Sequence, residues 1–575
     1  MIKQLLSSVR EYRFPSLIAP VLVAGQVAME VLLIDKTGTL IDNGIEAGDM
    51  SYVWRSGIFL LICLLVASLF SALSGRAAAI AGAGFANNLR RDMYYKIQDY
   101  SFSNIDKFKT SSIVTRLTMD VSNVSGAYQM LLSAAVRAPI MLIIATFSSF
   151  RRSPKLTLIL VGVAPFLVAG VALILRYAHP KFLRMLTTTD QMNNVVQENV
   201  RGIRVVKSYV RENHEIKKFS NVSQSICDDS IRAEGALSLS NPLMITSIYV
   251  SMIVISWFGA KMIVVKDMST GDMQTLLALN LEILSSLMML SMIIVSLVMS
   301  HASAKRIVEI LDEEPDIVNP KDPVMEVKDG SIDFDHVYFS YSKQKDRSCL
   351  TDIDIHVRTG ETVGIIGGTG VGKSSLIQLI PRLYDVTDGD VKIGGIDVRN
   401  YDLETLRDNV SVVLQKNELF AGTIKENLRW GNPEATDEEL ERACEIAQAD
   451  SFIRSFPDGY DTHIEQGGTN VSGGQKQRLC IARALLKKPK ILILDDSTSA
   501  VDTATDAKIR KGLADYAPGM TKLIIAQRIS SVEQADQIIV LDNGKISGVG
   551  THQELLANNA IYKEVYESQK KGGDE

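Results

Sequence analysis

Residues 367–374 read GGTGVGKS, and they lie between the β-rich run ETVGIIG and the helical run SSLIQLIPRLY. This order of strand, glycine loop and helix is the one that a phosphate-binding P-loop needs. Glycines let successive backbone N–H groups point into one concavity, because no Cβ stands in the way. Lys373 is expected to meet the β- and γ-phosphates of a nucleotide, and the Ser374 hydroxyl to help hold Mg²⁺. The predicted phosphate-binding residues are Gly367, Gly368, Thr369, Gly370, Val371, Gly372, Lys373, Ser374 and Ser375.

A second element of the predicted nucleotide site is the run ILILD at residues 491–495. Four apolar residues that end in a carboxylate are typical of a buried parallel strand that delivers an aspartate to Mg²⁺. Alone, such a run is ordinary core. Together with the P-loop it predicts a Walker B strand, with Asp495 as a metal ligand and with ATP and Mg²⁺ as cofactors.

Composition separates the chain into two unlike parts. At 575 residues it is too long for one ordinary core. The first part, about 300 residues, carries long apolar runs, whereas the remainder has the mixed charge and Gly-punctuated strands of a soluble α/β domain. The formal net charge of −5 gives no sign of nucleic-acid binding, and the five cysteines show no spacing typical of disulfides or of a zinc site.

Six segments of the first part are long and apolar enough to cross a bilayer, which takes ~20 residues per helix. They are residues 16–34, 57–79, 131–150, 156–177, 242–265 and 276–299. The loop 35–55 is mainly acidic and is predicted to be external, whereas the connections 80–130 and 179–240 are rich in Lys and Arg and are predicted to be cytoplasmic. Arg151, Arg152 and Lys155, in a short external loop, disagree with this orientation. Both termini are therefore expected in the cytoplasm.

The ends of these segments suggest the domain limits. The basic, apolar N-terminal residues favour a short helix at the membrane surface over a cleaved signal peptide. The two cytoplasmic connections have helical periodicity, so they are predicted to be helices that project beyond the bilayer. Prolines 315, 320 and 323 mark a linker. The expected organisation is a six-helix transmembrane domain at 1–310, a linker at 311–329 and an α/β nucleotide-binding domain at 330–575.

One further motif narrows the field. Residues 471–475 read VSGGQ, and here Ser472 and the glycines open a helix whose N-terminal N–H groups can receive a γ-phosphate. The P-loop already occupies the other side of that phosphate, so VSGGQ must serve a nucleotide held by a second domain of the same kind. With the P-loop, Walker B and VSGGQ present together, the chain resembles a half-transporter of the ATP-binding cassette (ABC) exporter family. Val471 replaces the leucine of the family's LSGGQ signature.

The resemblance assigns roles to further residues. Tyr341 in VYFSYS matches the aromatic residue that stacks on adenine, and Gln415 in VVLQKNELF matches the glutamine that contacts Mg²⁺ and senses the membrane domain. SAVD at residues 499–502 matches the D-loop, and Glu465 matches the exporter X-loop. The residues implied to bind nucleotide from the signature and the D-loop are Ser472, Gly473, Gly474, Gln475 and Asp502. NIDKFKTSSIVTRLTMDV and ENVRGIRVVKSYVRENHEIKKF resemble the two intracellular loops, whose tips are coupling helices that dock on the cassettes.

Two candidate catalytic residues depart from the family's pattern. Where the family has a glutamate after the Walker B aspartate, this chain has Asp496, one methylene shorter. Where the family has a switch histidine, this chain has Gln527. Loss of a well-placed base costs ~10²–10⁴-fold, and glutamine cannot carry a proton. The site is therefore expected to bind ATP well and to hydrolyse it slowly; a harmless exchange of Asp for Glu is the alternative.

In heterodimeric exporters of this family, such a subunit pairs with a partner that keeps the glutamate and the histidine but has an altered signature. The chain is thus expected to be the degenerate-site half of a heterodimer that exports drugs or other amphipathic small molecules across a bacterial plasma membrane. The alternatives are a homodimeric slow-ATPase exporter of peptide or lipid, and an ATP-gated channel or regulatory subunit. Glu30 and Glu282 inside predicted crossings suggest a cationic substrate, unless they pair with a polar neighbour or with Arg137.

Overall fold

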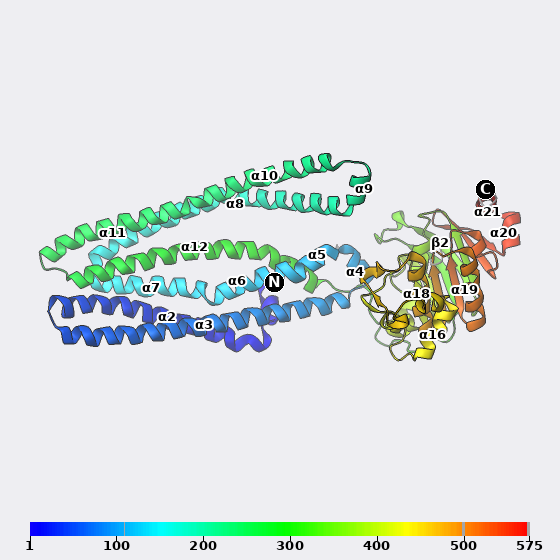
Figure 1. Cartoon of the computed structure of the whole chain (residues 1–575), viewed down its shortest axis with the longest axis horizontal. Coiled ribbons are helices and arrows are strands. Elements are labelled where there is room, and N and C mark those ends of the chain that lie inside the picture. Colours follow the sequence, from blue (N-terminus) through cyan, green and yellow to red (C-terminus); the bar gives the residue numbers. More distant parts are fainter. Residues whose placement is uncertain (109, 497–500, 572–575) are drawn as a thin grey trace. The chain divides into compact units, whose positions relative to one another are not determined.

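Long helices dominate the N-terminal half of the chain. The computed structural model describes residues 1–108, 110–496 and 501–571 and divides the chain into two units (Figure 1). The membrane unit comprises residues 1–98 and 110–313, and the soluble unit comprises residues 99–109 and 314–575. Long helices of the membrane unit include α2 (Arg13–Leu40), α3 (Met50–Gln98), α7 (Ala134–Arg152), α8 (Pro154–Arg201), α11 (Ser240–Val264) and α12 (Thr270–Asp312).

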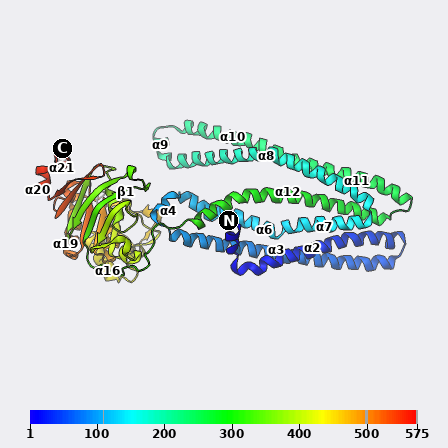
Figure 2. The ribbon, with the colours of Figure 1, turned by 180° about the vertical axis from the view of Figure 1, so that it is seen from behind.

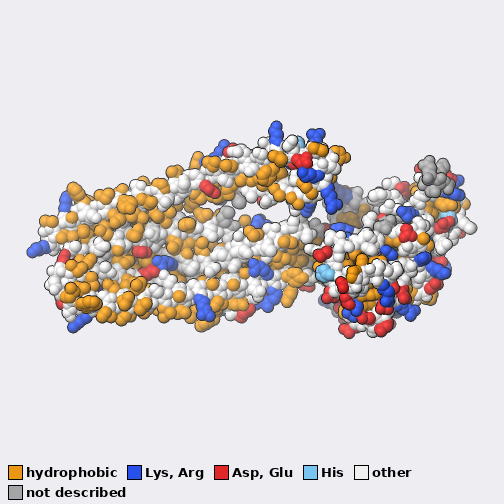
Figure 3. Space-filling view, viewed as in Figure 1, with side chains coloured by type: hydrophobic (Ala, Val, Ile, Leu, Met, Phe, Trp, Pro, Cys, Tyr) orange, Lys and Arg blue, Asp and Glu red, His pale blue; other side chains and the backbone are white. Residues whose placement is uncertain are grey.

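Six helical spans among the described residues are long and apolar enough to cross a membrane. Five of the six predicted crossings fall inside one of them, and the other, residues 242–265, extends one residue past the span that ends at Val264. Hydrophobic side chains cover the outer surface of these helices, as expected where lipid rather than water is the neighbour (Figure 3).

The predicted external loop at residues 35–55 is wrong in extent. Helix α2 continues to Leu40, a π-helical segment η2 (Ile41–Glu46) follows, and α3 begins at Met50. Two of the acidic side chains that suggested a loop, Asp35 and Asp42, have partners in other parts of the membrane unit. Asp42 accepts hydrogen bonds of 2.7 Å from the Ser269 hydroxyl and from the Gly271 backbone N–H at the start of α12. A carboxylate at a helix N-terminus is electrostatically favourable, so Asp42 holds the start of α12 to η2.

The two predicted cytoplasmic connections are helical. Helix α3 continues far beyond its apolar part, and α8 pairs with α10 (Glu212–Ser238) to form a long hairpin closed by α9 (Ile203–Ser208) (Figure 2). The remaining short elements before α7 are α1 (Ile2–Ser7), η1 (Arg10–Tyr12), α4 (Phe102–Lys107), α5 (Thr110–Thr115), η3 (Arg116–Asp120) and α6 (Val121–Leu132). Of these, only α4 belongs to the soluble unit.

The soluble unit is built on two larger sheets and one two-stranded pair. The main sheet has the order β12-β11-β3-β10-β9-β6, in which all neighbours are parallel except the edge strand β12. Its strands are β3 (Thr362–Gly367), β6 (Val410–Val413), β9 (Ile491–Asp495), β10 (Thr521–Ile525), β11 (Gln537–Asp542) and β12 (Lys545–Gly550). The antiparallel sheet, in the order β2-β1-β4-β5, contains β1 (Ile332–Phe339), β2 (Leu350–Val357), β4 (Asp388–Ile393) and β5 (Ile396–Asp397). Strands β7 (Gly422–Thr423) and β8 (His463–Ile464) form the pair.

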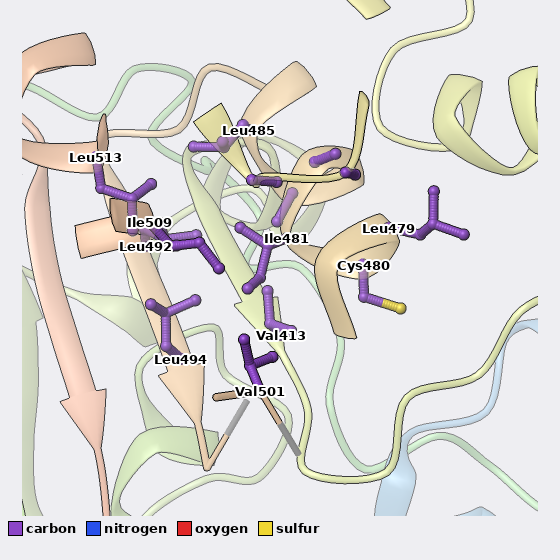
Figure 4. Close-up of a cluster of buried hydrophobic side chains, with 14 of the residues drawn as sticks. Val413, Leu479, Cys480, Ile481, Leu485, Leu492, Leu494, Val501, Ile509 and Leu513 are labelled. Carbon is purple, nitrogen blue, oxygen red and sulfur yellow. The ribbon is translucent and has the colours of Figure 1, made fainter. Parts of the chain in front are cut away.

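Helices cover the main sheet and complete its core. They are α13 (Lys373–Leu379), α14 (Leu403–Asn409), α15 (Ile424–Arg429), α16 (Asp437–Ile446), α17 (Asp450–Ile453), α18 (Gly473–Leu486), α19 (Thr503–Tyr516), α20 (His552–Asn558) and α21 (Ala560–Lys571). In one core cluster Ile481 from α18, Leu492 from β9 and Ile509 from α19 are all buried (Figure 4). All five residues of β9 are buried, as expected of a parallel strand with helices on its faces.

Candidate nucleotide site

The order of the main sheet brings four predicted motifs to one edge. Strands β3, β10, β9 and β6 are parallel neighbours. Ile365 pairs with Ile525, Ile525 pairs with Asp495, and Leu494 pairs with Val413, so these strands end at the same level. Ligands of such sheets bind outside the carboxyl ends of the strands. The predicted residues that follow at this edge are Gly367, Gln527, Asp496 and Gln415.

The P-loop after β3 has the backbone that its glycines allow. Gly370 and Gly372 have φ angles of +82° and +99°, which residues with a Cβ rarely adopt. A Cβ at Gly372 would lie 2.8 Å from Leu350 Cδ2, so the neighbouring strand also excludes a side chain there. The Lys373 ammonium donates hydrogen bonds of 2.7 Å to the Gly367 and Gly368 carbonyl oxygens. Lys373 therefore lies over the loop that is predicted to bind phosphate.

Asp495 and Ser374 form the part of the site that suits a divalent cation. The Ser374 side chain lies close enough to Asp495 to oppose a rise in its pKa, and Asp495 is buried. Burial raises the pKa of Asp495, and the neighbouring Asp496 carboxylate adds to this effect. One carboxylate and one hydroxyl match the small share of protein ligands that Mg²⁺ takes when phosphates supply the others. Mg²⁺ bound here would supply positive charge beside the phosphates, and Ser374 and Asp495 would hold it.

Asp496 occupies the position of the expected catalytic glutamate. Its carboxylate is only 9% exposed, and its Oδ2 accepts a 2.8 Å hydrogen bond from Gln527 Nε2. Gln415 Nε2 lies 3.5 Å from the same oxygen. Burial raises the pKa of Asp496, and the two amides oppose this rise. All three predicted catalytic residues thus converge, with two amide donors directed at one carboxylate oxygen.

Tyr341 lies beside the P-loop helix with its ring half-exposed. Its hydroxyl lies 2.9 Å from Ser375 Oγ and 3.2 Å from Gln378 Oε1, so the phenol is tied to α13. The rings of Phe339 and Tyr384 meet Tyr341 edge-on, at centroid distances of 4.8 and 5.2 Å. With 54% of Tyr341 exposed, part of its surface stays accessible to a planar base.

Sequence reasoning missed the contact between this aromatic group and the first intracellular loop. The Tyr384 hydroxyl donates a 2.6 Å hydrogen bond to the Asp106 carboxylate on α4, and Phe102 of α4 lies with its ring centroid 6.1 Å from that of Tyr384. Asp316 accepts hydrogen bonds from Ser103 at the start of α4 and from Lys343, two residues after Tyr341. Only the loop itself was singled out from the sequence, because no motif marks Tyr384 or Asp316.

The Asp316 contacts are electrostatically favourable. Burial pushes the pKa of this carboxyl up, but hydrogen bonds from Lys343, Ser101 and Ser103 outweigh it and bring the pKa down to about 2. The carboxylate therefore stays ionised and joins the linker, α4 and the segment after Tyr341 at any pH at which the protein functions.

The signature lies on a well-formed helix start. Ser472 is the N-cap of α18 and forms a reciprocal capping box with Gln475, whose side chain accepts from the Ser472 N–H at 2.8 Å. Ser472 and Gly473 are exposed, and Gly474 and Gln475 are partly exposed. In residues 110–496, no hydrogen bond or ion pair connects this segment to the P-loop.

Two other predicted segments are only partly placed. Asp502 is the N-cap of α19 and accepts a 2.9 Å hydrogen bond from the Thr505 N–H. Ser499 and Ala500 of the predicted D-loop lie outside the described residues. Glu465 is exposed next to β8, and its backbone N–H donates to Asn470 Oδ1. The nucleotide roles of Asp502 and Glu465 stay predictions.

Family models match both units. The model of the ABC transporter transmembrane region matches residues 17–299, and the ABC transporter model matches residues 350–499. The chain belongs to the ABC transporter family. It is 35% identical over 564 residues to the uncharacterized ABC transporter ATP-binding protein YfiB of Bacillus subtilis, with 98% of each chain covered. It is 30% identical to an ATP-dependent lipid A-core flippase of Syntrophus aciditrophicus, over 99% of this chain and 94% of that protein.

A solved structure shares the fold. A bacterial Atm1-family ABC exporter with ATP bound superposes with a TM-score of 0.84, at 23% identity, over 98% of this chain and 99% of the other. The chain is therefore a multi-pass ABC transporter whose ATP-binding domain makes it an ABC-type transport ATPase, and it has the fold of an ABC exporter half-transporter. The predicted family and fold class are confirmed.

The two glutamates inside the predicted crossings, Glu30 and Glu282, differ in their partners. Glu30 on α2 forms a 2.9 Å ion pair with Arg137 on α7, and Gln26 also donates to Glu30. The prediction that a glutamate could pair with Arg137 is thus met for Glu30. Glu282 on α12 lies near both groups, but in residues 110–496 no ion pair within 4.0 Å involves it.

Proposed function

We propose that this half-transporter is the subunit of a heterodimeric exporter that carries the degenerate nucleotide site. Its P-loop and Tyr341 would bind ATP with Mg²⁺, while Asp496 would hydrolyse it slowly. Its Ser472, Gly473, Gly474 and Gln475 would complete the active site built on the partner's P-loop. The partner would be a second ABC half-transporter with the usual glutamate, the switch histidine and an irregular signature.

One observation carries this proposal: Gln527 Nε2 donates to Asp496 Oδ2 at 2.8 Å. A general base must have a free lone pair within hydrogen-bond reach of the water whose proton it takes. Asp496 is one methylene shorter than the family's glutamate, and the amide that donates to one of its oxygens stabilises the ionised carboxylate and so makes it a weaker base. The site therefore favours retention of ATP over its hydrolysis.

Retained ATP gives the cycle its asymmetry. ATP bound at both sites would close the cassettes, bring the coupling helices together and turn the membrane helices from inward-facing to outward-facing. Hydrolysis at the partner's site would reset the cycle, while ATP at the Asp496 site would keep the cassettes partly in contact. The exported molecules would be drugs or other amphipathic small molecules that leave through a bacterial plasma membrane, with both termini of the chain in the cytoplasm.

The test restores the family residues. In the complex purified from membranes, we expect bound ATP to persist at this site through many turnovers of the partner's site. Asp496→Glu combined with Gln527→His should shorten this persistence and raise the total ATPase rate, because a base of ordinary length then faces the water. Unchanged ATP retention and an unchanged ATPase rate in the double variant would overturn the proposal.

A second candidate rests on the similarity to a lipid A-core flippase. In that case the chain would form a homodimer that exports lipid, with two identical slow sites. Transport of fluorescent lipid in vesicles that contain this chain alone would favour the homodimer. ATP-dependent uptake against a gradient would exclude an ATP-gated channel or a regulatory subunit without transport.

A further inference from the structure

The last turn of the C-terminal helix contacts the backbone of the switch segment. The side-chain amide of Gln569 on α21 donates from Nε2 to the Gln527 carbonyl oxygen at 2.7 Å. Its Oε1 accepts from the Ile529 backbone N–H at 2.9 Å. One amide thus satisfies a C=O and an N–H that lie two residues apart, which is the pattern that a neighbouring strand would offer. Strand β10 has ended two residues earlier, at Ile525.

Helix α21 is anchored firmly enough to hold Gln569 in place. Tyr562 is fully buried, its hydroxyl lies 2.8 Å from His552 Nδ1, and its N–H donates to Asn559 Oδ1. Val565 packs against the same core. Gln569 follows Tyr562 by seven residues, which is two helical turns, so both side chains lie on the same face of α21. The fixed face of the helix therefore presents the amide to residues 527–529.

This contact reaches the nucleotide site through a single residue. Gln527 has its backbone carbonyl held by Gln569 and its side chain donating to Asp496 at 2.8 Å. A rotation of the peptide after residue 527, which would redirect the side chain, must break the Gln569 hydrogen bonds. We infer that Gln569 is a positioning residue for the nucleotide site, which holds Gln527 against Asp496 and so slows the release of bound ATP. This inference rests on the proposed role of Gln527 in ATP retention.

The inference also gives helix α21 a regulatory role in ATP release. Anything that displaces the last turn of this helix would release the switch backbone without touching the P-loop or Tyr341. The rate of ATP release would then change while the initial binding of ATP, through the P-loop and the adenine-stacking ring, would not.

The test is a double-mutant cycle in the full-length chain, within the complex purified from membranes. Gln569→Ala and Gln527→Ala should each speed the release of prebound radiolabelled ATP, by roughly 3- to 10-fold, as expected for loss of about one ordinary hydrogen bond. Gln569→Ala should add nothing in the Gln527→Ala background, because it acts through that residue. The KM for ATP should not move.

Two further variants separate the two hydrogen bonds of Gln569 and control for a change on the same helical turn. Gln569→Glu retains an acceptor for the Ile529 N–H but loses the donor to Gln527, so we expect fast ATP release with the hydrogen-exchange protection of Ile529 largely kept. Glu567→Ala changes an exposed neighbour on the same turn and should leave ATP release unchanged.

The outcomes separate this inference from the proposed function. If Gln527→Ala speeds ATP release but Gln569→Ala does not, or if their effects add, Gln569 does not position Gln527 and the inference is overturned. If Gln527→Ala itself leaves ATP release unchanged, the proposed role of the switch residue fails first. The inference about Gln569 would also be overturned if Gln569→Ala lowered thermal stability as much as Gln527→Ala does but did not speed ATP release.

Discussion

Asp496 suits its backbone at a position where the family's pattern has a longer side chain. Its φ angle is +47°, in the left-handed region that Asp adopts more readily than most residues. Its backbone N–H donates to the Ile525 carbonyl at 3.0 Å and fixes it at the end of β9. A glutamate on this backbone would place its carboxylate closer to the water that attacks ATP. It would not adopt this φ angle more readily than aspartate does. The backbone at this position therefore accommodates Asp496 in place of the family's glutamate, and the proposed effect of the replacement is on reactivity.

At the same scale, the intramembrane pair of Glu30 and Arg137 predicts a stability effect. Glu30→Gln leaves the guanidinium without its carboxylate in a membrane helix, and breaking such a pair costs about 3–5 kcal/mol when it is fully buried. Both side chains are about one quarter exposed, so we expect a smaller loss of about 1–3 kcal/mol. Thermal unfolding of the detergent-purified exporter measures it.

The matched control for this prediction is Glu282→Gln, because Glu282 forms no ion pair within 4.0 Å in residues 110–496. It should change the unfolding temperature little. The Glu30→Gln, Arg137→Gln double variant should recover part of the loss, since no charge is left unpaired. A double variant less stable than either single variant would contradict the pairing.

At the scale of elements, the short helix α4 is held to the soluble unit by polar contacts at both ends. Ser101 caps α4 and also donates to Asp316, while Asp106 near its end accepts from Tyr384. The Tyr384 ring in turn meets Tyr341 edge-on. Tyr384 thus contacts both α4, in the loop that resembles the first intracellular loop, and Tyr341, the residue predicted to stack on adenine.

This arrangement predicts that Tyr384→Phe loosens α4 without weakening ATP binding. The variant loses a hydrogen bond to a carboxylate, which is worth about 1.5–3 kcal/mol when buried, but it keeps the ring beside Tyr341. We expect the hydrogen-exchange protection of the α4 amides to fall and the Kd for ATP to stay the same. Asp106→Asn, which keeps an acceptor without the charge, should give an intermediate effect. Unchanged protection in Tyr384→Phe would show that other contacts hold α4.

At the scale of the whole molecule, the exposed signature predicts a second cassette, and the proposed function predicts that a different chain supplies it. Ser472 and Gly473 are exposed and make no hydrogen bond to the P-loop in residues 110–496, so we expect a nucleotide between P-loop and signature to need a second cassette. We expect the native mass of the detergent-extracted complex to equal this chain plus one different half-transporter. A complex of two copies of this chain would contradict the heterodimer and favour the lipid-exporting homodimer.

Much of the exporter was predictable because its motifs are local. The P-loop, the buried strand ILILD and VSGGQ each depend on a few consecutive residues, and the apolar crossings depend only on composition over about one helix length. The loop at residues 35–55 was wrong because its acidic residues are local signals of exposure. The hydrogen-bond partners of Asp42 at the start of α12 lie 227 and 229 residues along the chain, so no local pattern reveals them.

The amino-acid sequence by itself determined the family, the six crossings and the two unusual residues, Asp496 and Gln527. Only the tertiary structure decided that these two residues bond to each other, because the order of β3, β10, β9 and β6 differs from their order along the chain. The same holds for Gln569, 42 residues from its carbonyl partner, and for Tyr384 and Asp106, 278 residues apart. Such contacts exist only once distant segments have packed, since sequence spacing alone does not set which strand ends become neighbours.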